Sequence, residues 1–583
     1  MIKRLMQSIR EYKKDSILAP LYVSCEVVLE VIIPFLTAAL IDKGIDAGDM
    51  NYVLKIGMLL ILCALISLTF GILSGRSASI AAAGFAKNLR KDMFDNVQNF
   101  SFSNIDKFST ASIVTRLTTD VANVQMAYMM IIRTAVRSPF MMIAALVMAF
   151  NVAGPLAFVF LACVPILGIA LYIIMTKTHP IFERVFKTYD KLNNVVQENL
   201  RGIRVVKSFV REDYEIKKFK SISEKIYEDF CHAERNIAFN MPVMQFCIYG
   251  SMIFVSWFGA RMIIASGNNP EIGLSTGELM SLFVYLMQIL MSLMMLSMIF
   301  VMITISRAGA ERIVEILNET SDIQSPEAAI TTVKDGSIDF ENVNFSYSNN
   351  VDKLCLKDID LHIRSGEIIG IIGGTGSGKS SLVQMIPRLY DATEGCVKVG
   401  GVNVKDYDLN ILRDTVAMVL QKNVLFSGTI KDNLRWGNPD ETDEQLIHAC
   451  KLAQADDFIK TFPDGYDTHI EQGGANVSGG QKQRLCIARA LLKKPKILIM
   501  DDSTSAVDTK TDAFIQKAFR EEIPDTTKII IAQRISSVEH ADKIIVMENG
   551  MIDAIGTHQE LLASNAIYKE VYTSQMKGGL GDE

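Results

Sequence analysis

The sequence predicts two parts of different class: an α-helical membrane domain with six transmembrane helices, followed by an α/β domain that folds in water. Three observations predict this division. The chain has 583 residues, too many for one compact domain, and 49% of them are hydrophobic. The long apolar runs end near Thr304, whereas the sequence beyond Ser337 reads as ordinary soluble α/β. The second part also contains a glycine-rich loop between a strand-like and a helix-like stretch.

The apolar runs are long enough to cross the hydrocarbon core of a bilayer, which is about 30 Å thick and takes roughly 20 helical residues. No cleavage site follows the first run, so we expect a retained helix and not a signal peptide. The basic N-terminus is expected inside, and the acid-rich loop from Asp42 to Asp49 outside. An even number of spans then returns the chain to the cytosol. The predicted spans are 16–41, 53–75, 127–151, 153–176, 241–265 and 278–304.

Two long polar segments, 76–126 and 177–240, separate spans 2 and 3 and spans 4 and 5. They have neither the Gly and Pro content of a linker nor an apolar core of their own. We therefore expect the membrane helices to continue far into the cytosol, each pair turning back through a short exposed helix.

Polar and methionine side chains within the spans have two interpretations. Glu26 and Glu30 lie one helical turn apart, as do Arg133 and Arg137. Because charges inside a membrane are costly, these four either pair or lie at the interface, or they contact a substrate. The methionines of span 6 indicate either ordinary packing or a promiscuous apolar cavity. They are Met280, Met287, Met291, Met294, Met295, Met298 and Met302.

Composition excludes some classes of function. The net charge of -6 gives no sign of nucleic-acid binding. The nine cysteines are scattered and form no CxxC or His-Cys cluster, which argues against a metal site or a disulfide framework. Neither observation points to a function of its own.

The glycine-rich loop has the sequence Gly-Gly-Thr-Gly-Ser-Gly-Lys-Ser, between an apolar run at 368–372 and a helix-like stretch at 381–388. This is the context of a P-loop, whose backbone N–H groups close around phosphates at a helix N-terminus. Lys379 is expected to reach the β- and γ-phosphates of ATP, and the Ser380 hydroxyl to ligate Mg²⁺. The predicted phosphate-binding residues are Gly373, Gly374, Thr375, Gly376, Ser377, Gly378, Lys379, Ser380 and Ser381.

A second apolar strand, 497–500, leads into Asp501, the expected Walker B acid that holds Mg²⁺ through water. Between the two motifs, the run 477–484 resembles the signature motif of ATP-binding cassette (ABC) proteins. Its core residues are Ser478, Gly479, Gly480 and Gln481.

Other residues follow in the order that the ABC family shows. Tyr347 stands where the family has an aromatic residue that stacks on adenine. Gln421 stands at the Q-loop position, where a glutamine senses Mg²⁺ and contacts the membrane domain. The run 503–508, which ends at Asp508, resembles the D-loop.

The membrane half resembles ABC exporters by its pattern of spans and loops. The segments 102–120 and 199–212 resemble the first and second intracellular loops, which carry coupling helices; in the family, the second docks on the partner's nucleotide domain. The resemblance implies an exporter-type membrane domain at 1–311, a linker at 312–337, an ABC-type P-loop domain at 338–575 and a tail at 576–583. It also implies a dimer, because each ATP lies between one chain's P-loop and the other's signature motif.

Two residues depart from the family pattern at the ATP site. The position after the Walker B acid normally holds Glu, which orients the attacking water, and here holds Asp502, one methylene shorter. Loss of general-base help typically costs about 10²–10⁴-fold in rate. The switch loop normally holds His and here holds Gln533, which cannot carry the charge of an imidazolium. Together they predict a degenerate site that turns ATP over slowly or not at all.

The signature residues are intact and can therefore serve the site of another chain. We expect a non-identical half-transporter as partner, with an intact Walker B Glu and switch His, as in the heterodimeric bacterial multidrug exporters that this pattern resembles. The expected activity is ATP-driven export of a small amphipathic, lipid or peptide substrate. The expected location is a bacterial inner membrane, with the nucleotide domain in the cytosol.

Two competing interpretations remain at this stage. An ATP-gated channel or regulatory membrane subunit would show ligand-gated conductance and no ATPase activity even with its partner. An importer with the exporter-type fold would take substrate into cells. The sequence identifies neither the substrate nor the partner.

Overall fold

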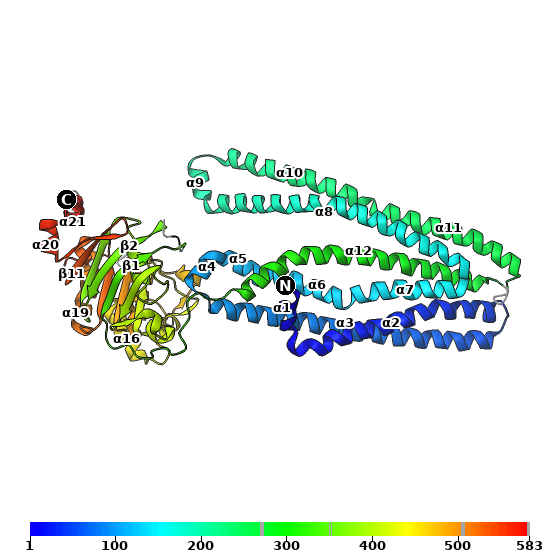
Figure 1. Cartoon of the computed structure of the whole chain (residues 1–583), viewed down its shortest axis with the longest axis horizontal. Coiled ribbons are helices and arrows are strands. Elements are labelled where there is room, and N and C mark those ends of the chain that lie inside the picture. Colours follow the sequence, from blue (N-terminus) through cyan, green and yellow to red (C-terminus); the bar gives the residue numbers. More distant parts are fainter. Residues whose placement is uncertain (269–272, 349, 351–352, 503–507, 580–583) are drawn as a thin grey trace. The chain divides into compact units, whose positions relative to one another are not determined.

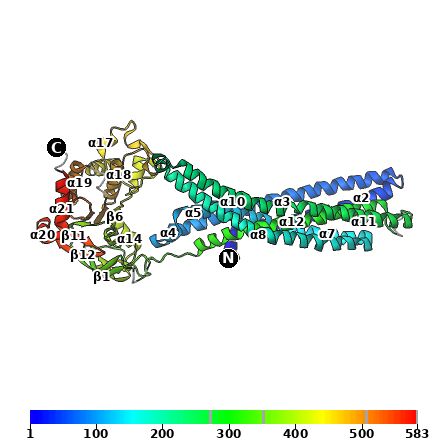
Figure 2. The ribbon, with the colours of Figure 1, turned by 90° about the horizontal axis from the view of Figure 1, so that it is seen from above.

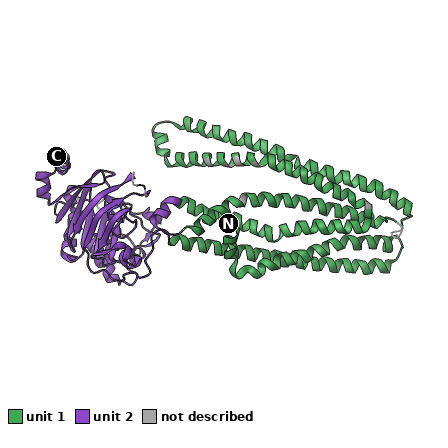
Figure 3. Cartoon of the chain, viewed as in Figure 1, with its two compact units in different colours: residues 1–98, 110–319 green, residues 99–109, 320–583 purple. Residues whose placement is uncertain are grey.

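The computed structural model describes residues 1–268, 273–348, 350, 353–502 and 508–579. The chain divides into two compact units, residues 1–98 with 110–319 and residues 99–109 with 320–583 (Figure 3). In the described part of the first unit, six helical stretches are long and apolar enough to cross a membrane. The predicted fold class, a six-helix membrane domain followed by an α/β nucleotide-binding domain, is confirmed.

The helices of the first unit run lengthwise along it (Figures 1 and 2). The α3 helix has 49 residues, which at 1.5 Å per residue is roughly 75 Å, more than twice the thickness of a bilayer core. The expected long extensions are therefore present, and the short α9 turns the chain between α8 and α10. The helices are α1 (Ile2–Met6), α2 (Lys13–Leu40), α3 (Met50–Gln98), α5 (Thr110–Thr115), α6 (Val121–Ile132), α7 (Thr134–Ala153), α8 (Phe158–Arg201), α9 (Ile203–Ser208), α10 (Glu212–Ala238), α11 (Asn240–Ser266) and α12 (Thr276–Asn318).

Two predicted spans differ in detail from the observed helices. The third is divided between α6 and α7, which meet at Arg133. The fourth was expected from residue 153, but a turn at Gly154–Ala157 separates α7 from α8. Gly154 has a positive φ of 45°, a conformation that glycine adopts without steric cost, and this ends α7. The predicted break between residues 151 and 153 therefore lies a few residues too early.

A proline in α2 explains how α12 packs against it. Pro34 lacks an N–H, so the carbonyl of Glu30, one turn earlier, loses its helical donor. Gln288 of α12 supplies a replacement, because its Nε2 donates to the Glu30 carbonyl at 3.3 Å. Tyr285, one turn earlier on α12 and fully buried, donates its hydroxyl to the Val31 carbonyl at 2.9 Å. These bonds fix the register of α12 on α2.

The second unit is built on two sheets. A six-stranded sheet has the order β12-β11-β3-β10-β9-β6, in which only β12 is antiparallel to its neighbour. A four-stranded antiparallel sheet has the order β2-β1-β4-β5. The strands are β1 (Ile338–Phe345), β2 (Leu356–Ile363), β3 (Ile368–Gly373), β4 (Glu394–Val399), β5 (Val402–Asn403), β6 (Val416–Val419), β7 (Gly428–Thr429), β8 (His469–Ile470), β9 (Ile497–Asp501), β10 (Thr527–Ile531), β11 (Lys543–Glu548) and β12 (Met551–Gly556).

The parallel strands are buried on both faces, which explains their continuous apolar runs. Ile529 and Ile531 of β10 face the core shared with the four-stranded sheet, whereas Ile530 faces the core shared with the helices. The helices of this unit are α4 (Phe102–Phe108), α13 (Lys379–Gln384), α14 (Leu409–Thr415), α15 (Ile430–Arg435), α16 (Asp443–Leu452), α17 (Asp456–Ile459), α18 (Gly479–Leu492), α19 (Thr509–Glu522), α20 (His558–Ser564) and α21 (Ala566–Gly579).

Candidate functional site

The P-loop joins the buried strand β3 to the helix α13, as its sequence context predicts. Gly376 and Gly378 have positive φ values of 82° and 93°, so the turn needs residues without a Cβ. A Cβ at Gly378 would lie 2.7 Å from a methyl group of Leu356. Lys379 folds back over the loop and donates from Nζ to the carbonyls of Gly373 and Gly374, at 2.8 and 2.7 Å. Its ammonium group therefore lies on the side of the loop where phosphates bind.

The Walker B strand β9 brings Asp501 to the end of the P-loop. The Ser380 hydroxyl donates to Asp501 Oδ1 at 3.0 Å, so two of the three residues predicted to hold Mg²⁺ are in contact. Hydroxyl and carboxylate oxygens are ligands that Mg²⁺ prefers, and the residues fit this ion. Burial raises the pKa of Asp501, and the neighbouring charge of Asp502 raises it further. Burial also lowers the pKa of Lys379. Both shifts have burial as their main cause, so each charged group is partly removed from water in the unliganded site.

Tyr347 belongs to an aromatic group that the sequence did not reveal. Its ring is 52% exposed, as a stacking platform requires, and its hydroxyl lies 2.8 Å from Ser381 Oγ. Tyr390 meets Tyr347 edge to face, with 5.1 Å between ring centroids. The Tyr390 hydroxyl donates to Asp106 Oδ2 of α4 at 2.9 Å, and Phe102 of α4 lies against the same ring. The α4 part of the predicted first coupling segment thus contacts Tyr390, which packs against Tyr347.

The signature residues form the start of α18. Ser478 is the N-cap, and a reciprocal capping box joins it to Gln481: the Gln481 N–H donates to Ser478 Oγ at 3.3 Å, and the Ser478 N–H donates to Gln481 Oε1 at 2.9 Å. Gly479 and Gly480 follow without side chains, so the helix N-terminus is open to an anion. Among the described residues, no hydrogen bond joins this helix start to the P-loop of the same chain.

The two departures from the family pattern are in direct contact. Gln533 Nε2 donates to Asp502 Oδ2 at 2.6 Å, and Gln421 Nε2 donates to the same oxygen at 3.4 Å. Asp502 adopts a positive φ of 50°, unusual for a residue with a Cβ. The Walker B neighbour, the Q-loop and the switch loop therefore converge on one carboxylate. The predicted D-loop residues 503–507 lie outside the described residues; Asp508 caps α19 by accepting from the Thr511 N–H at 2.9 Å.

The C-terminal helix α21 holds the switch loop through one side chain. Gln575 Nε2 donates to the Gln533 carbonyl at 2.8 Å, and Gln575 Oε1 accepts from the Ile535 N–H at 2.9 Å. The side chain thus bonds the backbone of the residue before Arg534 and of the residue after it. Like Tyr390, Gln575 carries no motif, and only the tertiary fold brings it to the site.

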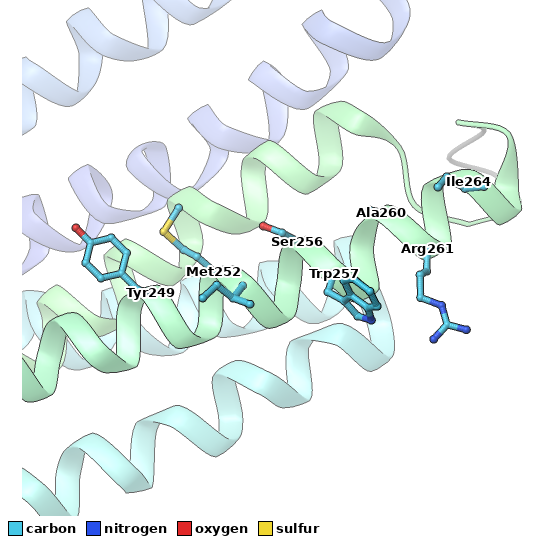
Figure 4. Close-up of a pocket in the computed structure, with 8 residues that line it drawn as sticks. Tyr249, Met252, Ser256, Trp257, Ala260, Arg261 and Ile264 are labelled. Atoms are coloured by element: carbon cyan, nitrogen blue, oxygen red, sulfur yellow. The ribbon is translucent and has the colours of Figure 1, made fainter.

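A separate apolar groove follows one face of α11 in the first unit (Figure 4). Its polar side chains are those of Tyr249, Ser256 and Arg261, while Trp257 and Ile264 supply much of its apolar surface. With Met252, Ile253 and Ala260, the lining residues fall in pairs that recur every three to four positions, as one face of a helix requires. The groove is open and is not part of the nucleotide site.

Comparisons with known proteins agree with this geometry. Residues 17–311 match the family described as ABC transporter transmembrane region, and residues 356–505 match the family described as ABC transporter. The ABC transporter ATP-binding protein YfiB of Bacillus subtilis (strain 168) is 34% identical over 98% of both chains. The ABC transporter ATP-binding protein Rv1273c of Mycobacterium tuberculosis is 35% identical over 99% of both chains.

A solved structure described as a bacterial Atm1-family ABC exporter with ATP bound has a TM-score of 0.82 to this chain. The match covers 97% of this chain and 99% of the chain in that structure. Because the sequence identity is only 23%, the match shows the fold alone. The chain belongs to the ABC transporter family. It is a half-transporter in which an exporter-type membrane domain is fused to an ABC ATPase domain, the part of the family that couples ATP hydrolysis to transport.

Proposed function

We propose that this chain is one half of a heterodimeric exporter whose own ATP site is degenerate. The observation that carries the proposal is the 2.6 Å hydrogen bond from Gln533 Nε2 to Asp502 Oδ2. A carboxylate oxygen that already accepts from an amide is poorly available to a water molecule. A histidine at the same position would offer an imidazole that can exchange a proton, whereas an amide can only hold the carboxylate in place.

The binding part of the site supports ATP retention. The P-loop residues 373–381 hold the phosphates, and Tyr347 offers the adenine a face that Tyr390 supports from its edge. Ser380, Gln421 and Asp501 would hold Mg²⁺, Asp501 through water. The ion offsets the charge of the phosphates and of the buried Asp501. This chain then binds ATP tightly while it contributes little chemistry.

The signature residues give this chain its role in hydrolysis. Ser478 to Gln481 open α18 towards an anion, and in the proposed dimer that anion is the γ-phosphate held by the partner's P-loop. The partner contributes the Walker B Glu and the switch His. A homodimer would contain two degenerate sites, so the proposal requires a non-identical partner.

ATP binding is coupled to transport through the coupling segments. Closure of the two nucleotide domains moves α4, which Tyr390 joins to the adenine platform, and α9 with the turn after it, where the exposed Val205 and Val210 suit a partner surface. The cavity then switches from inward- to outward-facing, and hydrolysis at the partner's site resets it. ATP shifts this equilibrium only by its differential affinity for the two states.

The remaining assignments are part of the same proposal. The membrane domain comprises 1–311, the linker 312–337, the nucleotide domain 338–575 and the tail 576–583. The protein resides in a bacterial inner membrane with its nucleotide domain in the cytosol. Its substrate is a small amphipathic compound, a lipid or a peptide.

Paired variants of this chain, each assembled with a half-transporter that has the Walker B Glu and switch His, test the proposal. Ser478→Arg places a large cation at the start of α18 and should abolish ATPase activity of the heterodimer. Asp502→Ala removes the degenerate carboxylate and should leave that activity within about twofold. The reverse pattern, in which Asp502→Ala abolishes activity and Ser478→Arg does not, would show that this chain's own site performs hydrolysis.

A further inference from the structure

Four charged side chains gather where α2, α3, α7 and α12 meet in the membrane domain. Arg137 of α7 bridges two acids of α2: its Nη1 bonds Glu26 Oε1 at 2.8 Å, and its Nη2 bonds the carboxylate of Glu30 at 2.7 Å. Arg133, at the junction of α6 and α7, lies four residues before Arg137. The formal charges of the four sum to zero, so the cluster as a whole is electrically balanced.

Two glycines bring α3 close to these charges. A Cβ at Gly71 would lie 3.2 Å from Glu26 Oε1, and one at Gly75 would lie 3.6 Å from Arg133 Nη1. Glu26 and Arg133 therefore lie against successive turns of α3. The two glycines let the helix backbone approach both charged groups.

Two buried acceptor atoms near this cluster have no donor among the described residues. Glu26 is only 7% exposed, and among the described residues its Oε2 has no hydrogen-bond partner. Among the described residues, Gln288 Oε1 is also buried without a partner, and Gln288 Nε2 donates to the carbonyl of Glu30, one turn after Glu26 on α2. By contrast, both oxygens of Glu30 accept from Arg137. Buried acceptors without donors are costly and mark places where a donor binds.

We propose that Glu26 and Gln288 recognise a primary ammonium group at the polar end of an amphiphilic substrate. An ammonium group has three donors and no acceptor, and a bond to a carboxylate is charge-assisted. Gln288 shares a face of α12 with the exposed Met291 and Met295, which suit the apolar part of such a substrate. The inference rests on the proposed transport function, because it names the substrate class of the same membrane domain.

Three fluorescent probes with the same alkyl chain test this recognition. One ends in a primary ammonium, one in a trimethylammonium that keeps the charge but has no N–H donor, and one in a neutral acetamide with a single N–H donor. Binding to the full-length protein in nanodiscs is measured without nucleotide, and partition into empty nanodiscs is subtracted. The ammonium probe should bind about tenfold more tightly than the trimethylammonium probe. Equal binding of these two probes overturns the proposal.

Matched variants locate the site. Glu26→Gln replaces the unpartnered acceptor with a donor of the same size and should remove the preference for the ammonium probe. Glu30→Gln changes a carboxylate whose oxygens already have donors and should keep it. If Glu26→Gln does not fold, Gln288→Leu takes its place and should also weaken the ammonium probe. If every folded variant at positions 26 and 288 still prefers the ammonium probe over the trimethylammonium probe, these side chains have a purely structural role and the inference is refuted.

Transport is measured separately with the same ammonium probe, so that the two proposals fail in different ways. Selective binding without ATP-driven movement across proteoliposomes containing the heterodimer would contradict the exporter function and leave the site intact. ATP-driven movement of all three probes at equal rates would support export and contradict the role of Glu26.

Discussion

The hydrogen bond between Tyr390 and Asp106 joins α4 to the nucleotide domain, and its contribution to stability can be measured. Tyr390→Phe keeps the ring that packs against Tyr347 and removes only the hydroxyl that donates to Asp106 Oδ2 at 2.9 Å. A hydrogen bond to a charged group contributes about 1.5–3 kcal/mol when buried. Solvent reaches this pair, so we expect about 1 kcal/mol. For a domain of this size, that corresponds to a fall in Tm of about 3 °C.

Thermal unfolding followed by tryptophan fluorescence measures this change in the correct domain. The chain has two tryptophans, Trp257 and Trp436, and Trp436 lies in the nucleotide domain, stacked on Phe426 at 4.1 Å. In a Trp257→Phe background the signal therefore reports the nucleotide domain. Tyr572→Phe is the matched control, because no hydrogen bond of its hydroxyl is found among the described residues.

A double-mutant cycle then decides whether the two side chains act together. Asp106→Ala should lower Tm by a similar amount, and Tyr390→Phe in that background should add almost nothing. Losses that simply add, or a Tyr390→Phe variant as stable as its control, would refute the idea that this bond joins α4 to the nucleotide domain.

Three further predictions concern the site itself. Gly378→Ala should lower stability by about 1–3 kcal/mol in thermal unfolding, because its φ is positive and a Cβ meets Leu356, whereas Gly374→Ala, with open space around it, should be nearly neutral. Burial raises the pKa of Asp501, so folding favours its protonated form. This contribution to stability is present at low pH and is lost as pH rises through the raised pKa. Asp501→Asn should therefore raise the nucleotide-free Tm near neutral pH, flatten its dependence on pH and abolish stabilisation by Mg²⁺-ATP. Gln575→Ala should speed amide exchange in the switch loop about fivefold, since one exposed and one partly buried hydrogen bond are lost.

The sequence predicted those features that depend on local pattern. The six spans follow from apolar length, and the P-loop follows from a motif between a strand and a helix, so both were visible without contacts. The turn between spans 3 and 4 was predicted a few residues too early, because the run around Gly154 stays apolar. Tyr390 and Gln575 were missed because their partners lie 284 and 42 residues away, and no local spacing encodes such contacts.

The membrane charges show the same limit. The spacing of Glu26, Glu30 and Arg137 favoured pairing and left substrate contact as an open alternative. The structure shows the pairing and also a carboxylate oxygen that the pairing does not satisfy. Which oxygen has a donor depends on side-chain geometry across three helices.

ATPase activity of the purified chain, alone and with a half-transporter that carries the Walker B Glu and switch His, tests the central claim most directly. The comparison includes Asp502→Glu/Gln533→His, which restores the family pattern in this chain. The account predicts negligible turnover by the chain alone, robust turnover by the pair, and a gain for the double variant alone. Brisk turnover by the unaltered chain would show that Asp502, even with Gln533 bound to it, suffices for hydrolysis, and the degenerate-site account would be wrong.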